Sequence, residues 1–266
     1  MMGLSVAQRS ECGGQKCNED SLGFCADETL GCFVLADGAG GHGGGDVASK
    51  FVVRQVLAQF SSSPVVSQSA IAATITAARQ ALTQLRTKYP RLSAMDTTLA
   101  TLMLDTQRAI AFWSHLGDSR IYFFRNGRAR KLTNDHSILQ SMIDSGLLDG
   151  AARGNKHRNV LYAAVGSGEI PAQAVCENPL ALQSGDIFLL CSDGFWESVS
   201  EGVMEEMLLE AESPEQWLND MVCQLPDPSA AEQDNFSALA IWVGMPEEST
   251  RRISVQKAKH NKYQNQ

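Results

Sequence analysis

The sequence predicts an α+β domain built from antiparallel sheets covered by helices, and two features of the chain predict it. Strand-like segments arrive in neighbouring pairs joined by short turns, at residues 98–104 with 109–115 and 120–124 with 129–132. Long helix-like segments also arrive in pairs, at residues 46–60 with 67–89 and 199–209 with 214–224. This order differs from the strand–helix alternation that builds a parallel sheet. The length of 266 residues suits one large domain or two small ones.

In the first half of the chain, apolar runs predict strands and longer mixed stretches predict helices. The run at 32–36 is apolar throughout and is expected to be a buried strand. The helix at 46–60 begins with Asp46, whose carboxylate is placed to cap it. The Ala- and Gln-rich helix at 67–89 is stopped by Pro90.

The second half contains two further strands that are strongly apolar, at 186–192 and 236–243. Residues 136–145 are expected to form a helix, and the polar residues 147–160 that follow it are expected to form a loop. The tail at 246–266 is polar and basic, which predicts that it lies outside the folded domain.

The charge of the chain is unevenly distributed. Five of the 22 Lys and Arg residues and none of the 30 acids lie in residues 251–266, so the rest of the chain carries 17 basic and 30 acidic residues. An acidic body argues against nucleic-acid binding and is compatible with a protein that collects cations. No apolar run of about 18 residues predicts a membrane span, and the polar N-terminus predicts no secretory signal. The seven cysteines include no CxxC pair, which favours free thiols in the cytoplasm.

Several carboxylates stand beside strand-like segments, where an apolar run ends or begins. They are Asp37, Asp118, Asp193, Asp234 and the pair Glu19-Asp20. Strand ends can meet at one edge of a sheet, and carboxylates gathered there repel one another unless protons or cations neutralise them. Hard oxygen ligands suit Mg²⁺ or Mn²⁺ better than zinc. The sequence therefore predicts a divalent-metal site, to which the exposed carbonyl of Gly38 can add a ligand.

Seven motifs occur in the order typical of one enzyme family over about residues 13–243. They are NED at 18–20, ADGAGGHGGGDVAS, TTLATLML, HLGDSRIYFFRNGRARKLTNDHS, NVLYAAVGS, GDIFLLCSDGFWESV and DNFSALAIWV. On these motifs the sequence resembles the metal-dependent protein serine/threonine phosphatases of the PPM or PP2C family, in their compact bacterial form. The resemblance implies a four-layer α-β-β-α sandwich over residues 1–245, a flap at 136–165 and a basic tail at 246–266.

The resemblance also implies a centre of two Mn²⁺ or Mg²⁺ ions, with a possible third. Asp37 would bridge the two ions, and the Gly38 carbonyl would join one of them. The remaining implied ligands are Asp193 and Asp234 at the other ion, Glu19 and Asp20 beside the centre, and Asp118 with Asp193 at a third ion. A water between the two ions would be acidified to hydroxide and attack phosphorus in line. The implied substrates are bacterial phosphoserine and phosphothreonine proteins, with a eukaryotic-like Ser/Thr kinase as the opposing partner.

Three positions depart from the family pattern. The family usually has a phosphate-gripping Arg where this chain has Gln15, and the neighbouring Lys16 supplies charge without a bidentate fork. Ala39 stands where eukaryotic members carry a His, whereas His42 matches the histidine that bacterial members often carry three residues further on. His42 is either a proton donor or substrate contact, or a loop histidine with no role. Asp96 replaces the usual Gly, a change expected to alter only the start of a strand.

The sequence also admits other interpretations. In the expected flap, His157 and Arg158 either contact the phosphoprotein or are solvated loop charges. Because of Gln15, a pseudophosphatase that binds phosphoproteins without cleaving them is the main alternative. A dinucleotide-binding loop fits Gly38-x-Gly40-x-x-Gly43, but Asp37 would then face a pyrophosphate, and no acid-ended strand follows at the required spacing.

Overall fold

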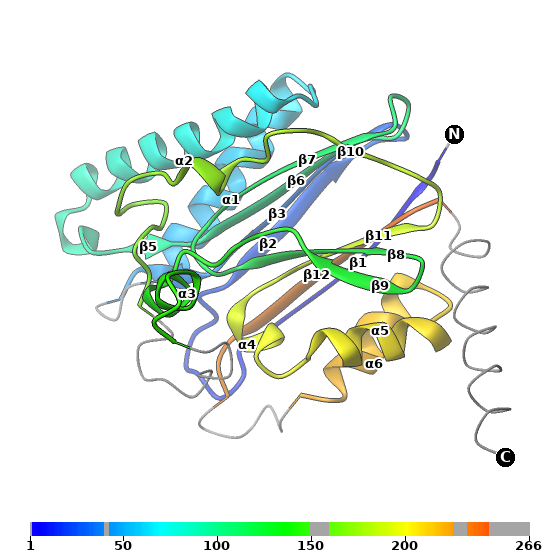
Figure 1. The fold of residues 1–266 in the computed structure, drawn as a ribbon. Coiled ribbons are helices and arrows are strands. Elements are labelled where there is room, and N and C mark those ends of the chain that lie inside the picture. Colours follow the sequence, from blue (N-terminus) through cyan, green and yellow to red (C-terminus); the bar gives the residue numbers. More distant parts are fainter. Residues whose placement is uncertain (1, 40–42, 149–159, 226–232, 245–266) are drawn as a thin grey trace, which may run out of the picture.

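The computed structural model describes residues 2–39, 43–148, 160–225 and 233–244, and these form a four-layer α-β-β-α sandwich (Figure 1). Two five-stranded antiparallel sheets make the central layers, and helices cover the outer face of each. The predicted α+β class and the implied four-layer arrangement are therefore confirmed. The antiparallel sheets exclude a dinucleotide-binding fold, which needs parallel βαβ units. Within the described ranges, no helix has the length and apolarity needed to cross a bilayer.

The first sheet is built around β12, every residue of which is buried. Its strand order is β1 (Leu4–Glu11), β12 (Phe236–Val243), β11 (Asp186–Cys191), β8 (Arg120–Arg125) and β9 (Arg128–Lys131). Apart from Asp186 in β11 and Ser237 in β12, both strands are apolar, because each has one face on the other sheet and the other face under helices.

The second sheet has β6 and β3 near its centre. Its strand order is β10 (Leu180–Ala181), β7 (Ile110–Leu116), β6 (Leu99–Asp105), β3 (Leu30–Ala36) and β2 (Ser21–Ala26). A separate two-stranded ladder pairs β4 (Gly38–Ala39) with β5 (Asp96–Thr97). This ladder continues from the end of β3 and brings residues 38–39 beside 96–97.

Helices of different lengths cover the two sheets (Figure 1). The second sheet is covered by α1 (Gly45–Ser62) and α2 (Gln68–Lys88), and the first by α4 (Asp193–Trp196), α5 (Glu201–Glu210) and α6 (Pro214–Val222). The remaining helices are α3 (Ile138–Asp144) and the 3₁₀ turns Pro90–Leu92 and Ala172–Ala174. The Ser67 hydroxyl caps α2 by accepting a hydrogen bond from the Ala70 amide at 3.1 Å.

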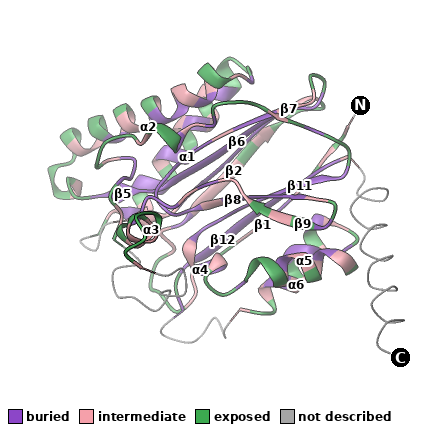
Figure 2. Cartoon of the chain, viewed as in Figure 1, coloured by how far each residue is buried: buried purple, intermediate pink, exposed green. Residues whose placement is uncertain are grey.

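Three apolar cores hold the layers together, and Figure 2 shows that burial is concentrated on the strands. The inner core lies between the sheets and includes Phe33, Leu102 and Phe188. The outer core under α5 and α6 includes Trp217, whose ring meets Phe124 edge-on at 5.0 Å between centroids. The sheets therefore form a rigid base whose connecting loops can hold a site.

The predicted strands and helices lie within two residues of the observed bounds, but several elements were missed. The sequence analysis did not anticipate β1, β2, β10 or the short helix α4. The assignment of Asp46 as a helix cap was wrong. The N-cap of α1 is Gly44 in a left-handed conformation (φ 97°), and Asp46 lies in the first turn, where it pairs with Lys50 at 3.4 Å.

Candidate active site

One cleft of about 840 Å³ gathers most of the residues that the sequence marked as a site. The carboxylates come from the end of β3, the β7–β8 turn, the start of α4, the segment before β12 and the segment before β2. The predicted ligands that line the cleft are Glu19, Asp37, Gly38, Asp118, Asp193 and Asp234. Residues far apart in the sequence therefore meet at one edge of the sandwich.

Asp37 follows β3 and is fixed through its main chain. Its amide donates to the Thr98 hydroxyl at 2.8 Å. Its carbonyl accepts hydrogen bonds from the Thr98 amide and the Thr97 hydroxyl, each at 2.8 Å. The Thr98 hydroxyl also lies 2.7 Å from that of Ser119. Because neighbouring residues hold the backbone, the Asp37 side chain is left to line the cleft.

The segment that contains Glu19 and Asp20 is held from two sides. The Glu19 amide donates to the side-chain oxygen of Asn235 at 2.7 Å, and its carbonyl accepts from the Gly38 amide at 3.1 Å. Asp20 is buried, and its Oδ2 accepts from the Ser192 hydroxyl at 2.7 Å. Its Oδ1 is buried and has no hydrogen-bond partner among the described residues. A buried carboxylate oxygen without a partner is costly and is suited to a cation or an ordered water.

Asp193 and Asp118 are linked through helix α4. Asp193 is the first residue of α4, and Trp196, the last, donates its indole N–H to the Asp118 carbonyl at 3.0 Å. Gly117 enters the turn before Asp118 with φ 93°, and a Cβ there would meet the Thr98 side chain at 2.6 Å. The turn can therefore approach Thr98 only with glycine at this position.

Burial and mutual repulsion raise the pKa values of the cleft carboxyls. Burial is the largest cause of the strongly raised pKa of Asp37, and the charges of Asp20, Asp193 and Asp118 add to it. Burial, followed by the charge of Asp193, also raises the pKa of Asp118 well above its usual value. The pKa of Asp20 rises to about 7, again mainly through burial. Burial likewise raises the pKa of Glu19. These groups favour a shared proton or a cation over separate negative charges.

Gly38 meets a strict requirement for close backbone contact. A Cβ at this position would lie 2.5 Å from the carbonyl carbon of Gly45 and 2.8 Å from the carbonyl oxygen of Glu19. Only glycine lets β4 pass between the start of α1 and the acidic segment. The glycine density after Asp37 therefore has a packing reason in addition to the one inferred from the sequence.

The rim of the cleft carries Gln15 and Lys16, both exposed. Their loop is anchored by Asn235, whose amide donates to the carbonyls of Cys12 at 2.7 Å and Cys17 at 3.1 Å. Gln15 and Lys16 are therefore presented by an anchored loop at the mouth of the cleft.

Three predicted site residues, His42, His157 and Arg158, lie outside the described residues, as do most of the loop 147–160 and the tail 246–266. Their expected roles stay predictions. In the described part of the expected flap, Leu161 bridges to Ser137 and lines the cleft.

Sequence reasoning missed Thr98, Asn235 and Leu161. All three lie within the motifs TTLATLML, DNFSALAIWV and NVLYAAVGS. Thr98 and Asn235 are polar residues at strand ends close to marked acids, and this pattern is the signal that indicates their role as anchors. Nothing in the local pattern around Leu161 indicates that it reaches the cleft.

The chemistry of the candidate ligand atoms suits a hard divalent cation. The candidate ligands are carboxylates and one carbonyl, and Asp20 offers a buried oxygen without a partner. The charge of Asp193 and a hydrogen bond with its side chain are among the causes that raise the pKa of Asp37. No three His, Cys, Asp or Glu side chains in the described part of the chain stand in a ready-made metal-binding arrangement. The assignment of individual ligands therefore stays a proposal.

The fold and the cleft together define a class of protein: an α-β-β-α sandwich with an acidic, oxygen-lined site at the ends of its sheets. A family model described as protein phosphatase 2C matches residues 7–233. The serine/threonine protein phosphatase PstP of Mycobacterium tuberculosis is 30% identical over 210 residues, which is 78% of this chain and 38% of PstP. The serine/threonine phosphatase stp of Listeria innocua is 32% identical over 200 residues, which is 72% of this chain and 77% of that protein.

Among solved structures, the catalytic domain of PstP in complex with two manganese ions is similar, with a TM-score of 0.77 and 26% identity over 92% of this chain and 100% of that one. The chain belongs to the protein phosphatase 2C family, and the predicted resemblance to the PPM or PP2C metal-dependent serine/threonine phosphatases is confirmed. The aligned part spans little more than a third of the mycobacterial relative's length.

Proposed function

We propose that this chain is a metal-dependent phosphatase that removes phosphate from phosphoserine and phosphothreonine in proteins. One observation carries the proposal: acids from five separate places in the chain line a single cleft. Burial and neighbouring carboxylates raise the pKa values of Asp37 and Asp118, and the charge of Arg120 offsets this only in part at Asp118. Family membership supplies the reaction class, and the manganese-bound PstP domain supports the choice of ion.

The residues that would hold two ions, with a possible third, are those implied by the resemblance. Asp37 would contact both of the first two ions, and the Gly38 carbonyl would join one of them. The others are Asp193 and Asp234 at the second ion, Glu19 and Asp20 beside the pair, and Asp118 with Asp193 at a third ion. Bound Mn²⁺ or Mg²⁺ supplies acidified water and offsets the charge of the transferring phosphoryl group.

The protein's own groups position the reactants. Thr98 holds the backbone of Asp37, and Asn235 anchors the rim loop. We assign Gln15 and Lys16 to substrate binding, where the lysine provides charge for the phosphate without the bidentate geometry of arginine. We assign His42 to proton donation to the leaving oxygen, and His157 and Arg158 to contact with the phosphoprotein.

The proposed partners follow from this chemistry. The substrates are phosphorylated proteins, and a Ser/Thr kinase of the eukaryotic-like type would oppose the reaction in a bacterial cytoplasm. We assign residues 1–245 to the phosphatase domain, 136–165 to a flap beside the cleft and 246–266 to a basic tail. The acidic body argues against nucleic acid as a partner.

The test is hydrolysis of p-nitrophenyl phosphate and of a phosphothreonine peptide in Mn²⁺. We expect turnover with both substrates that EDTA abolishes. Asp37→Asn should lower the rate by orders of magnitude, whereas Glu28→Gln, an exposed acid outside the cleft, should leave it unchanged. Tight phosphopeptide binding without turnover would favour a pseudophosphatase, which Gln15 alone supports. Near-normal turnover by Asp37→Asn would refute the metal assignment.

A further inference from the structure

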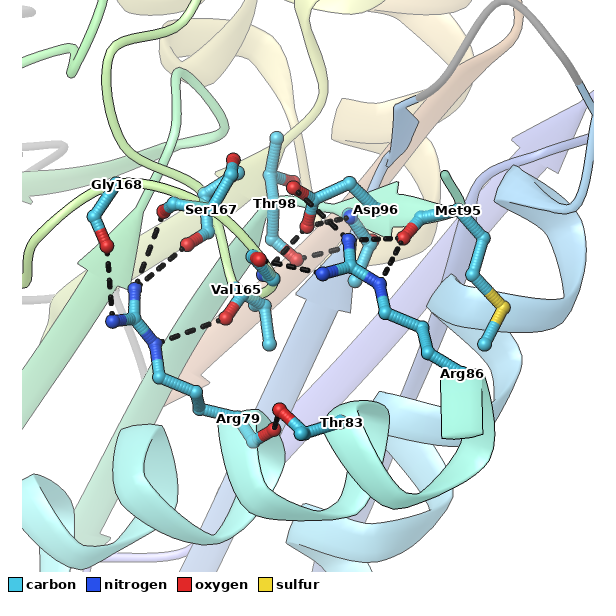
Figure 3. Close-up of polar contacts among 12 residues, drawn as sticks. Arg79, Thr83, Arg86, Met95, Asp96, Thr98, Val165, Ser167 and Gly168 are labelled. Atoms are coloured by element: carbon cyan, nitrogen blue, oxygen red, sulfur yellow. Dashed lines mark hydrogen bonds and ion pairs between the residues drawn. The ribbon is translucent and has the colours of Figure 1, made fainter. Parts of the chain in front are cut away.

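Helix α2 sends two arginines to one short loop (Figure 3). Arg79 and Arg86 are seven residues apart, which is close to two helical turns, so they share a face of α2. The loop is residues 164–168, at the end of the segment that carries Leu161. Both guanidinium groups approach the loop from the α2 side, as the close-up shows.

Arg79 alone binds four carbonyls of this loop. Its donors reach the carbonyls of Val165 at 3.0 Å, Ala164 at 3.1 Å, Gly168 at 3.1 Å and Ser167 at 3.3 Å. Arg86 binds the fifth, the carbonyl of Gly166, at 2.6 Å. Every backbone carbonyl from 164 to 168 therefore accepts a hydrogen bond from a charged guanidinium on one face of α2, and such charge-assisted hydrogen bonds are stronger than neutral ones.

Asp96 joins the same network from the other side. Its Oδ1 accepts from the Gly166 amide at 2.6 Å and from the Thr97 amide at 2.8 Å, and its Oδ2 lies 3.5 Å from Arg86. Arg86 also donates to the Met95 carbonyl at 2.8 Å. Asp96 thus does more than alter the start of a strand, because it ties β5, α2 and the loop together.

Gly166 shows how closely this network is packed. A Cβ on Gly166 would lie 2.2 Å from a terminal nitrogen of Arg86. The guanidinium of Arg86 therefore rests directly against the loop backbone, in the space that a side chain would take.

The network is connected to residues that line the cleft in two ways. Leu161 lines the cleft three residues before the captured loop begins. The Val165 amide donates to the Thr97 carbonyl at 2.9 Å, and Thr97 in turn bonds the Asp37 carbonyl. The loop is therefore fixed between α2 and the backbone that holds Asp37.

We propose that Arg79, Arg86 and Asp96 form a clamp that positions the Leu161 wall of the cleft, and that this wall determines how well a phosphorylated peptide binds. They are positioning residues, since they do not line the cleft. The inference rests on the proposed phosphatase function for its substrate class. A small aryl phosphate is short enough to bind without this wall, whereas a peptide extends along it.

The test compares two substrates in Arg79→Lys and Asp96→Asn, with Lys88→Gln as a control at an exposed position of the same helix. A lysine ammonium cannot reach four carbonyls at once, and an asparagine keeps an acceptor but loses the charge that pairs with Arg86. We expect each clamp variant to raise KM for a phosphothreonine peptide about tenfold, with kcat retained. The kcat/KM for p-nitrophenyl phosphate should change less than about twofold. Hydrogen exchange of the amides at 160–168 should become faster in the clamp variants and stay unchanged in the control.

Two results would overturn the clamp. One is an equal loss for both substrates that follows a fall in melting temperature, because that indicates a role in stability alone. The other is faster exchange at 160–168 with unchanged peptide KM. If the wild type hydrolyses neither substrate, the proposed function fails. The clamp is then decided by the Kd for the same peptide in Mn²⁺, for which a tenfold weakening supports it and an unchanged value refutes it.

Discussion

Asp20→Asn provides a direct test of how the buried carboxyl of Asp20 is neutralised. The pKa of Asp20 rises from 3.8 to about 7, mainly because the carboxyl is buried. Three pKa units correspond to about 4 kcal/mol. The folded state binds this proton more tightly than the unfolded state does. The stability that the bound proton contributes is therefore complete below pH 3.8, and it is lost as the pH rises through 7.

The variant should reverse this loss in the metal-free protein. Asparagine keeps an oxygen that can accept from Ser192 but carries no charge. The free energy of unfolding of Asp20→Asn, minus that of the wild type, should grow from near zero at pH 4 towards about 4 kcal/mol at pH 8.

Urea unfolding in EDTA at several pH values, followed by tryptophan fluorescence, measures this difference. Added Mn²⁺ should stabilise the wild type more than the variant, because a bound cation replaces the missing neutralisation. Glu28→Gln serves as the control and should show no trend. A difference that stays constant from pH 4 to pH 8 would refute the assignment of a buried, proton-binding carboxyl at position 20.

Three further predictions concern packing and geometry. Asp135→Asn removes the charge of the carboxylate that pairs with Arg120, whose guanidinium nitrogens lie 2.9 and 2.6 Å from the carboxylate oxygens. Because the pair is largely buried, urea unfolding should show a loss of about 3–5 kcal/mol in stability. A loss under about 1 kcal/mol would contradict the importance of this buried ion pair. Gly38→Ala should lower p-nitrophenyl phosphate turnover about 100-fold because its Cβ overlaps the backbone of Gly45, and a rate close to wild type would show that the loop adapts. Leu82→Ala should cost about 2–5 kcal/mol of stability, because this side chain of α2 is fully buried in the core. The kcat in Mn²⁺ should stay unchanged. A comparable loss of stability in Gln84→Ala, at an exposed position of α2, would refute the packing argument.

The local sequence was enough to predict the strands with a strong apolar pattern. Both β11 and β12 are apolar except for Asp186 and Ser237, and their predicted bounds agree with the structure to within one residue. Strand β1 was missed because its residues, LSVAQRSE, are largely polar and partly exposed. Its extended form is stabilised by antiparallel pairing with β12, more than 200 residues away, and a local window contains no trace of that partner.

The sequence by itself determined the class of the fold and the carboxylates that mark the site. Both depend on short-range patterns, namely the period of apolar residues and the placing of each Asp at a strand end. Only the tertiary structure decided that most of these acids line one cleft, that Asp20 is buried with an oxygen that has no partner among the described residues, and that Arg79 and Arg86 bind the loop 164–168. Those facts depend on which distant segments become neighbours. Burial, repulsion and hydrogen bonding act between atoms that are close in space, and the distance between residues along the chain does not encode them.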